Sequence, residues 1–521
     1  MYHVSLYQPE TTTAAGLGIQ KEGFGEYLYW LTRGRKEDIL NVKIKNFDLS
    51  ITCDKKGLMT MLSQETVNAV LKAARETGGD FAELYLEDTL SNSLKLVDGR
   101  VEDATSSHSR GAGVRVFAGL KTAYAYTADT SLDSLLATAR AAGAAVSGSS
   151  TPQDVRFEVK NYARVPGIPA DTVSNAARIA VLKTACEAAK AVSDEIRQVQ
   201  VLLMDVDKTV LVANSEGVYG IDRRPRVRLY VQAVASDGKS TQTGTEGPGF
   251  AMGYEALDLI DIIGTAQTAA RRAVTMLHAP ECPASNCPVV IDGGFGGVIF
   301  HEACGHSLEA TSVSRGNSEF CGKLGMQVAA DCVTAIDDGT LPGQWGSFGM
   351  DDEGTPTKRR LLIENGVLKS YMIDRLGSLR MGLPVTGSAR RQNYRFAPTS
   401  RMTNTFIAAG KDDPEEMIRS MGEGLYAKAM GGGSVNPLTG EFNFAVSEGY
   451  WVKNGEIVTP VRGATLIGRG TDVLMKIDRV GSRMWMGQGM CGSQSGSIPT
   501  NVGQPRIRVR EMTIGGKGGA L

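Results

Sequence analysis

The sequence predicts an α+β protein built from two unlike domains. One is an N-terminal α/β domain with long helices and a mostly antiparallel sheet, and the other is a β-rich, barrel-like C-terminal domain. Before Pro280, segments with apolar residues at helical spacing are interspersed with strand-like segments in which apolar and polar residues alternate. Beyond Pro280, short β-branched runs and glycine turns dominate. Because 521 residues suffice for two or more domains, we expect one at 61–280 and the other at 281–521.

Residues 1–60 differ from the rest of the chain and are interpreted as an atypical extension. They show no sustained helical or alternating pattern. Met59 or Met61 would be a natural start, since the nearby Ser63 has the character of a helix N-cap. We expect that the upstream start is mis-assigned, and a genuine extension with its own role is the alternative.

The N-terminal domain begins with a predicted helix. Val67 and Leu71 lie one helical turn apart behind Ser63 as the N-cap, and Gly78-Gly79 ends the helix. Further on, Asp98-Gly99 predicts a type I′ turn within a hairpin. The elements expected after the first helix are a strand at 82–87, a hairpin at 94–102, strands at 113–117 and 122–127, helices at 132–145 and 170–192, three or four strands between 197 and 235, and a helix at 254–277.

Turn chemistry also predicts hairpins in the C-terminal domain. Asn365-Gly366 and Asn454-Gly455 each lie between alternating segments, and Asn-Gly favours the type I′ turn of a two-residue hairpin. One helix is expected at about 414–429, before three consecutive glycines. We expect a curved or barrel-like sheet that carries one further helix, which holds the metal site.

The strongest functional signal is the segment from His301 to His306, with the sequence His-Glu-Ala-Cys-Gly-His. Two of the five histidines of the chain flank Glu302 here; imidazole nitrogens are common zinc ligands, and such a glutamate is the usual general base. The histidines stand five residues apart, which places them about 140° apart on an ideal α-helix at roughly 100° per residue. Both can reach one metal ion only if the helix is widened by a π-bulge or broken between them. Gly305 permits such a distortion.

The residues before this motif predict its place in the fold. Residues 287–292 are a short β-branched run that predicts a buried strand, and 293–297 form a glycine-rich turn. Strand, turn and helix together are a common way to position a reactive group at the end of an element. The glycines lack the spacing of a phosphate-binding loop.

A catalytic zinc site needs three protein ligands and one open position. His3, His108 and His278 lie in a tail, a polar turn and a helix end, so they are poor candidates for the third ligand. A cysteine or a carboxylate remains. Cys304 lies inside the motif, but one distorted turn would then have to supply three ligands at tetrahedral angles. We favour Cys491, in a glycine-rich segment that is expected to be an irregular loop folding over the helix.

Composition and charge argue against several other functions. A formal net charge of -1 gives no sign of a nucleic-acid-binding or membrane-seeking surface, and no apolar run is long enough to span a bilayer. The first residues lack the pattern of a secretory signal. Eight scattered cysteines without a framework spacing fit a reducing cytoplasm. We expect a cytoplasmic protein with no nucleic-acid and no membrane partner.

Two charged segments allow a functional and a structural interpretation. Arg390, Arg391 and Arg395 could contact a substrate carboxylate or a partner, but a solvated basic face is the commoner meaning of such a run. Asp351-Asp352-Glu353 could hold a cation, but an exposed acidic turn is expected instead.

The motif and its flank, from His301 to Glu309, resemble the signature of the TldD/PmbA metallopeptidases. The segment from Cys491 to Pro505 resembles the C-terminal block of that family, and the resemblance runs from about Met61 to the C-terminus. It implies Glu302 as the general base. Since PmbA-like (TldE) subunits characteristically lack the metal motif, a chain that keeps it resembles the TldD, catalytic side of the pair. The ligands that the resemblance implies for Zn²⁺ are His301, His306 and Cys491.

The expected function is a zinc-dependent peptidase, working as a TldD subunit in a heterodimer with a PmbA/TldE-like partner; a homodimer is the other assembly considered. Glu302 would accept a proton from the metal-activated water and deliver it to the leaving amine. The resemblance implies unfolded or small peptides as substrates, and a β-rich wall could bind them by strand addition. The alternative is a peptide-binding regulatory subunit with a structural zinc, which four protein ligands, Cys304 included, would indicate.

Overall fold

The computed structural model describes residues 3–4, 39–44, 47–54, 62–436 and 438–519. The chain divides into two compact units, Met1–Thr60 and Met61–Leu521, which we describe separately. In the first unit an antiparallel sheet has the strand order β1-β3-β2, which the sequence did not predict. Its strands are β1 (His3–Val4), β2 (Ile39–Ile44) and β3 (Phe47–Asp54).

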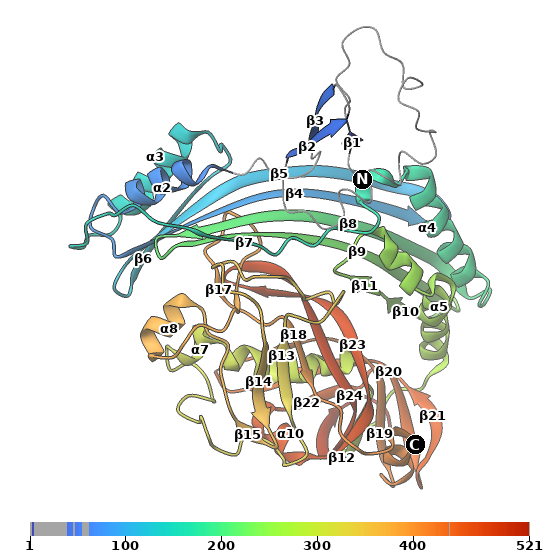
Figure 1. The fold of residues 1–521 in the computed structure, drawn as a ribbon. Coiled ribbons are helices and arrows are strands. Elements are labelled where there is room, and N and C mark those ends of the chain that lie inside the picture. The colour runs from blue at the N-terminus through green and yellow to red at the C-terminus, as the bar shows by residue number, and fades with distance from the viewer. Residues whose placement is uncertain (1–2, 5–38, 45–46, 55–61, 437, 520–521) are drawn as a thin grey trace. The chain divides into compact units, whose positions relative to one another are not determined.

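An eight-stranded sheet forms the N-terminal part of the second unit (Figure 1). The order is β10-β9-β8-β4-β5-β6, with β7 and β11 beside β9, and all pairs except β7–β9 are antiparallel. The predicted antiparallel sheet is therefore confirmed. The strands are β4 (Phe81–Val97), β5 (Arg100–Ala118), β6 (Lys121–Thr127), β7 (Glu158–Asn161), β8 (Ile196–Asn214), β9 (Val218–Ser236), β10 (Thr241–Glu246) and β11 (Gly249–Phe250).

Residues 197–235 form two long strands, where the sequence predicted three or four. The strands β8 and β9 are 19 residues each and join at Gly217, which has a φ of 99°. Strands this long persist because each is paired on both sides within the sheet, so that the polar positions inside them do not end the strand.

Two pairs of helices lie at opposite ends of this sheet (Figure 1). One pair is α2 (Gln64–Ala74) with α3 (Leu132–Ala144), and the other is α4 (Asn175–Lys190) with α5 (Ile262–His278). The predicted N-cap is confirmed, because the Ser63 side chain accepts a hydrogen bond from the backbone N–H of Thr66. The apolar sides of α4 and α5 close over β8 and β9 in one hydrophobic core.

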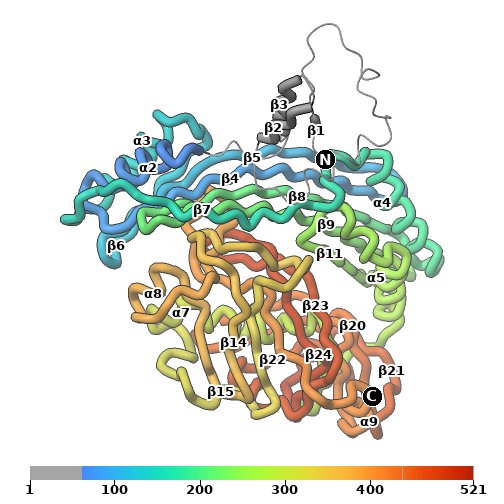
Figure 2. The backbone as a smooth tube through the Cα atoms, in the orientation of Figure 1, coloured from blue at the N-terminus to red at the C-terminus, as the bar shows by residue number. Residues whose placement is uncertain are grey.

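A closed five-stranded barrel is the centre of the C-terminal part, which confirms the barrel-like prediction. Its strands follow the order β12-β19-β20-β22-β24, and β24 pairs again with β12. Only the β12–β19 pair of the barrel is parallel. Figure 2 shows the later strands of the barrel in orange and red beneath the N-terminal sheet in blue and green. The barrel strands are β12 (Ser285–Ile291), β19 (Gly424–Val435), β20 (Glu441–Lys453), β22 (Thr465–Arg469) and β24 (Gly496–Gly515).

Further strands extend from the barrel. The strand β23 forms a long hairpin with β24, β21 pairs with β20, and β18, β13, β14 and β15 continue the sheet from β24. These strands place the end of the β23–β24 hairpin near the helical segment that follows β12. They are β13 (Ala335–Asp338), β14 (Arg359–Glu364), β15 (Val367–Leu368), β18 (Asn404–Ile407), β21 (Glu456–Val461) and β23 (Ile477–Ser493).

All three predicted type I′ turns are confirmed. Both central residues of each turn have positive φ, a backbone conformation that Asn, Asp and Gly adopt at little cost. The φ values are 48° and 82° at Asp98 and Gly99, 48° and 80° at Asn365 and Gly366, and 53° and 77° at Asn454 and Gly455.

The helix predicted at 414–429 is wrong in its second half. The helix α9 (Pro414–Arg419) ends shortly before Gly422, whose φ of 77° is typical of a helix C-cap. From Gly424 the chain is the barrel strand β19. Pairing with β12 and β20 therefore outweighs the helix propensity of its alanine and lysine residues.

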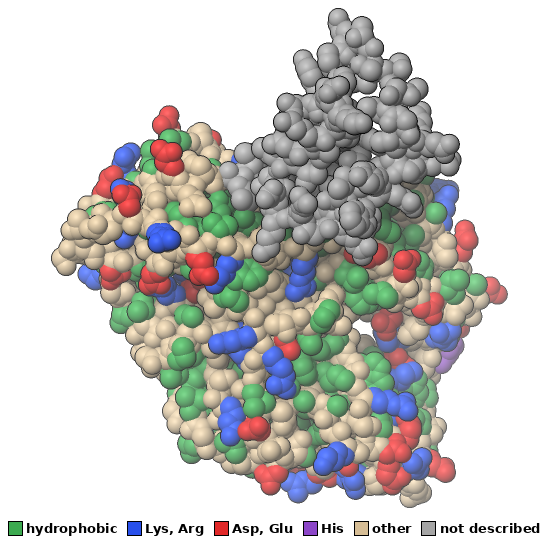
Figure 3. Space-filling model, in the orientation of Figure 1, with side chains coloured by type: hydrophobic (Ala, Val, Ile, Leu, Met, Phe, Trp, Pro, Cys, Tyr) green, Lys and Arg blue, Asp and Glu red, His purple; other side chains and the backbone are tan. Residues whose placement is uncertain are grey.

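None of the described helices is long and apolar enough to cross a membrane. On the face shown in Figure 3, basic and acidic side chains are interspersed, in keeping with the net charge of -1.

Candidate metal centre

The metal motif lies where the chain leaves β12. It turns at Gly294, with a φ of 68°, and enters a helical segment of changing type. This segment is α-helical at Val298–Phe300, a π-helix at His301–Gly305 and a 3-10 helix at His306–Leu308. A π-helix is one of the two distortions that the histidine spacing required, so this prediction is confirmed.

Glycines let this helical segment pack against its neighbours. A Cβ at Gly305 would lie 2.2 Å from Sδ of Met402, and a Cβ at Gly297 would lie 2.6 Å from the carbonyl oxygen of Gly503 in β24. Any larger residue at Gly297 would have to displace backbone, so the segment and β24 keep a fixed separation.

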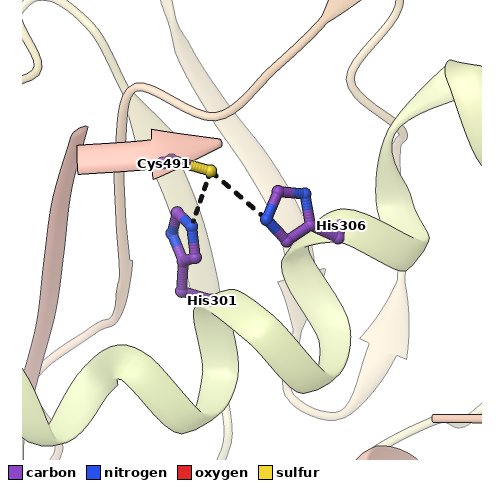
Figure 4. A group of neighbouring side chains, drawn as sticks. All are labelled: His301, His306 and Cys491. Atoms are coloured by element: carbon purple, nitrogen blue, oxygen red, sulfur yellow. Dashed lines mark hydrogen bonds between the residues drawn. The ribbon is translucent and has the colours of Figure 1, made fainter. Parts of the chain in front are cut away.

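The π-helix brings both imidazoles to one side, where they meet Cys491 (Figure 4). Nε2 of His301 and Nε2 of His306 each lie 3.2 Å from Sγ of Cys491. The ring centroids are 5.1 Å apart, and the three ligand atoms lie within 4.8 Å of one another. The structure thus brings together the three residues predicted as ligands, and their role as ligands remains a prediction.

This donor set fits a zinc ion. A tetrahedral site with Zn–N bonds of about 2.0 Å and a Zn–S bond of about 2.3 Å needs N···S separations near 3.5 Å, close to the 3.2 Å observed. Among the described residues, no fourth histidine, cysteine or carboxylate joins the group. Two imidazoles and one thiolate would leave a coordination position open.

The electrostatics of the site favour the ionised form of the Cys491 thiol. Burial would raise the pKa of Cys491, but the charges and hydrogen bonds of His301 and His306 lower this pKa to about 3. Burial lowers the pKa of His306, yet Glu309 and Cys491 outweigh it and hold that pKa well above its usual value. At neutral pH a thiolate therefore lies beside an imidazolium, and a metal ion must displace the proton of His306 to bind.

Glu302 borders the ligand group without joining it. Its Oε2 lies 3.7 Å from Nε2 of His306, and its side chain is 31% exposed. It lines a cavity of about 320 Å³ together with His306 and Gly492. A carboxylate on the wall of an open cavity beside metal donors is placed to exchange protons with a water molecule or a substrate.

Two buried residues that the sequence analysis did not single out support this site. Oε2 of Glu309 lies 3.2 Å from Nδ1 of His306 and accepts its N–H, which directs Nε2 toward Cys491. The fully buried Arg401 donates to the carbonyl oxygen of Cys491 at 2.5 Å, and its Nε lies 3.9 Å from Oε1 of Glu309. The position of Glu309, three residues after His306, was a signal available in the sequence. Nothing in the sequence around Arg401 indicates that it supports the site.

Cys491 lies on a strand, which corrects the predicted irregular loop. It pairs with Ile498 across the β23–β24 hairpin, whose end is the pair Ser493 and Gly496. The glycines around it suggested a loop, but the long register with β24 holds them extended. Cys304 belongs to the hydrophobic core, where burial raises its pKa well above the usual value.

The remaining histidines lie elsewhere. His108 bonds to Asp88 at 2.7 Å and His278 bonds to Glu195 at 2.8 Å, both with exposed rings. The side chain of His3 lies outside the described residues.

The two charged segments are mostly buried, which contradicts the predicted solvated faces. Each residue of Asp351-Asp352-Glu353 is at most 6% exposed, and Arg390 and Arg391 are 5% and 3% exposed. Arg395 alone is exposed as expected. The physical reason is that Asp352, Glu353 and Arg391 find counter-charges on the N-terminal sheet, far away along the chain, where local sequence does not show them. Asp351 and Arg390 bond to backbone groups of the C-terminal part instead.

We call the resulting cluster the interface network; it joins β4, β5 and β9 to the C-terminal part. Burial, together with neighbouring carboxylates, raises the pKa of Asp351 to about 7 and that of Glu353 to about 8. Its ion pairs are Arg115–Glu83 at 2.9 Å, Arg115–Glu353 at 2.6 Å, Arg224–Asp352 at 2.7 Å and Arg391–Glu83 at 2.7 Å. Asp351 lies beside these pairs and accepts hydrogen bonds from backbone N–H groups.

Three family models match this chain. They are PmbA/TldA metallopeptidase domain 1 at residues 82–146, the central domain at 168–277 and the C-terminal domain at 284–516. The last of these contains the helical segment, Cys491 and the cavity beside them.

Relatives agree with this match. A Haemophilus influenzae protein named metalloprotease TldD homolog is 35% identical over 466 residues, which cover 87% of this chain and 97% of that protein. A Saccharolobus solfataricus protein named zinc metalloprotease TldD homolog is 32% identical over 55% of this chain and 64% of its own length. The crystal structure of TldE from Thermococcus kodakarensis shares the fold, with a TM-score of 0.68 at 16% identity over 86% of this chain and 99% of that chain. This chain therefore belongs to the PmbA/TldD family of metallopeptidases.

Proposed function

We propose that this chain is a zinc-dependent peptidase of the cytoplasm that hydrolyses unfolded or small peptides. In this proposal it is the TldD-type subunit of a heterodimer with a PmbA/TldE-like partner. One observation carries the proposal: His301, His306 and Cys491 converge beside an open cavity whose wall bears Glu302. Three donors, an open position and an adjacent carboxylate are the parts of a catalytic rather than a structural zinc site.

In this proposal each residue of the site has a separate role. Bound zinc would supply Lewis acidity and lower the pKa of a water molecule. Glu302 accepts a proton at its carboxylate and passes it to the leaving amine of the peptide. Glu309 keeps His306 oriented, and Arg401 keeps the carbonyl group of Cys491, and so the thiol, next to the histidine segment.

On one edge the strand β23 has no partner among the described strands, which supports binding of an extended peptide. This strand pairs with β24 on one side, and no described strand pairs with its other side between Gly487 and Ser493. Side chains of Arg228, Trp345 and Arg401 already donate to the carbonyl oxygens of Gln488, Gly489 and Cys491, so an added peptide would bond through the remaining main-chain groups. Cys491 lies within this stretch, so a peptide added as another strand would pass beside the metal donors. Strand addition recognises main chain more than side chains, which suits an enzyme with broad peptide preference.

The fold likeness to TldE supports a partner of similar architecture. Two chains of one fold can pair through equivalent surfaces, as the subunits of symmetric dimers do. A homodimer would use the same surfaces, and the mass of the purified complex distinguishes the two assemblies.

The alternative function is a peptide-binding regulatory subunit with a structural zinc. A closed site of that kind needs four protein ligands. Within the described residues the group holds three, and the side chain of Cys304 packs in the core instead of joining it. The open cavity therefore favours the peptidase.

Metal content and hydrolysis of an unstructured peptide test the proposal. We expect the wild type to bind about one zinc ion per chain and to cleave the peptide. Its activity is measured once with the partner and once without it. Glu302→Ala should keep the zinc and lose about a hundredfold or more in rate, whereas Cys491→Ala should lose the zinc. Cys332→Ala, at an exposed free cysteine, is the control and should behave as wild type. A wild type without zinc, or a Glu302→Ala that cleaves normally, would refute the peptidase.

A further inference from the structure

Two cavities border the strand β23 on either side of Cys491. The larger, of about 1070 Å³, is lined by residues that include Trp485, Gln488 and Met490. The smaller, of about 320 Å³, is lined by Gly492 and the residues at the end of the hairpin. Successive residues of one strand therefore line first one cavity and then the other, with the candidate metal ligand at the boundary. A peptide lying along β23 would have a long arm on one side of the site and a short arm on the other.

The smaller cavity has room for a short end of a peptide. Ligand cavities are commonly roughly 300–1,000 Å³, so this one lies at the lower limit. Ser312 and Asn317 are among the residues that line it, and its volume is less than a third of that of the larger cavity.

The smaller cavity is lined by an uncommitted cation. Arg315 lines the smaller cavity and is exposed, and within the described part of the chain its guanidinium has no hydrogen-bond or ion-pair partner. Asn317, Ser493 and Gln494 line the same cavity with side-chain amide and hydroxyl donors. An arginine fork surrounded by such donors matches the geometry of a carboxylate.

The larger cavity also carries basic side chains. Arg272, Lys428 and Arg506 are each paired with a carboxylate of the chain, Arg228 donates to two carbonyl oxygens, and Arg483 is, like Arg315, exposed and without an ion-pair partner among the described residues. In the smaller cavity Glu309 is bound to His306. Glu302 is therefore the carboxylate that a substrate anion would meet there, and the positive charge of Arg315 offsets the repulsion between them.

We propose that Arg315 makes the smaller cavity a carboxylate subsite, so that the enzyme prefers a scissile bond close to a free C-terminus or to an acidic side chain in the equivalent position. This inference rests on the proposed peptidase function. The reaction is plain hydrolysis: the amide C–N bond breaks, the hydroxyl of water joins the acyl carbon, and the proton goes to the amine of the short released fragment.

Three peptides of one sequence test the preference. One has a free C-terminal carboxylate, one a C-terminal amide, and one a C-terminal amide with an aspartate near its end. With the zinc-loaded heterodimer, we expect kcat/KM for the free acid to exceed that for the amide by about tenfold, with the first cut within a few residues of the C-terminus. The aspartate peptide shows whether a side-chain carboxylate serves as well as a terminal one.

Substitutions locate the effect. Arg315→Gln should lower kcat/KM of the free acid to that of the amide, leave the amide unchanged and keep the zinc content. Arg359→Gln, at an exposed position outside both cavities, is the matched control and should keep the full preference. Arg483→Gln, at the larger cavity, should also keep it.

The outcomes separate this inference from the peptidase proposal. Equal cleavage of acid and amide by the wild type would overturn the carboxylate subsite while the peptidase stands. A preference that survives Arg315→Gln, or one that Arg483→Gln removes instead, would overturn it as well. If the zinc-loaded wild type cleaves none of the peptides, the peptidase proposal itself fails and the subsite with it.

Discussion

The metal centre and the interface network are both buried groups of charged side chains, but they are organised in opposite ways. In the network the arginines are paired with carboxylates of the chain, and its members come from distant positions, Glu83 and Arg391 being 308 residues apart. In the metal centre a thiolate lies next to imidazoles at the edge of a cavity, and two of its three residues come from one motif. The first arrangement fixes how parts of the chain fit together, whereas the second keeps its donors available for a ligand. Substitutions should therefore separate stability from metal binding.

Arg391→Met should give the largest loss of stability. It leaves Glu83 with fewer counter-charges in a buried place, and breaking such a pair lowers the free energy of unfolding by about 3–5 kcal/mol. Urea denaturation followed by circular dichroism measures the loss. The exposed Arg395→Met is the control and should leave the urea midpoint close to that of the wild type. Equal midpoints for both variants would show that the network is not what holds these parts together.

Stability should fall as the pH rises through the neutral range. The folded-state pKa values of Asp351, about 7, and Glu353, about 8, lie above the values of an unfolded chain, which are near 4. Between these pKa values the folded state binds more protons than the unfolded chain. The contribution of the two carboxyl groups to the free energy of unfolding is therefore complete below about pH 4 and is lost toward pH 8. It amounts to a few kcal/mol, on the order of magnitude that linkage gives. Urea midpoints at several pH values measure the slope.

Glu353→Gln is the matching variant for this pH dependence, because glutamine stays neutral throughout. Its midpoints should decline less steeply with pH than those of the wild type. Parallel curves for the two proteins would mean that Glu353 does not titrate in this range.

Glu309→Gln should weaken zinc binding without removing a ligand. Loss of the hydrogen bond to Nδ1 of His306 frees the ring to turn, and such supporting partners typically contribute about 10–100-fold in metal affinity. Competition with a chelator measures the affinity. Glu319→Gln is the control, since this buried carboxylate pairs with Arg469 and Thr471 and not with a histidine. Equal affinities for wild type and Glu309→Gln would leave Glu309 with a packing role only.

The metal centre could be predicted from the sequence further than the network because two of its three residues lie in one motif, whereas Cys491 is 185 residues from His306. The five-residue spacing of His301 and His306 required a distorted helix, and the structure has a π-helix there. Two-residue turns such as Asn454-Gly455 were likewise determined by the conformations that those residues allow. Arg401, which bonds to the strand of Cys491, was missed because nothing near it in the sequence marks its partner.

The errors arose where long-range pairing decides local structure. Residues 424–429 have helix-forming side chains, but they lie in the barrel beside β12 and are therefore extended. Asp352 and Arg391 look like solvated surface charges until the N-terminal sheet supplies Arg224 and Glu83. Gly422 and Gly424 were sequence signals that could have ended the predicted helix earlier, and Gly422 indeed has a positive φ.

X-ray absorption at the zinc edge of the purified wild type tests the open three-ligand site most directly. We expect one sulfur at about 2.3 Å, two imidazole nitrogens and one further light atom that the protein does not supply, with the sulfur signal lost in Cys491→Ala. Two sulfurs, or a complete shell of four protein ligands, would show a closed structural site and refute the open one.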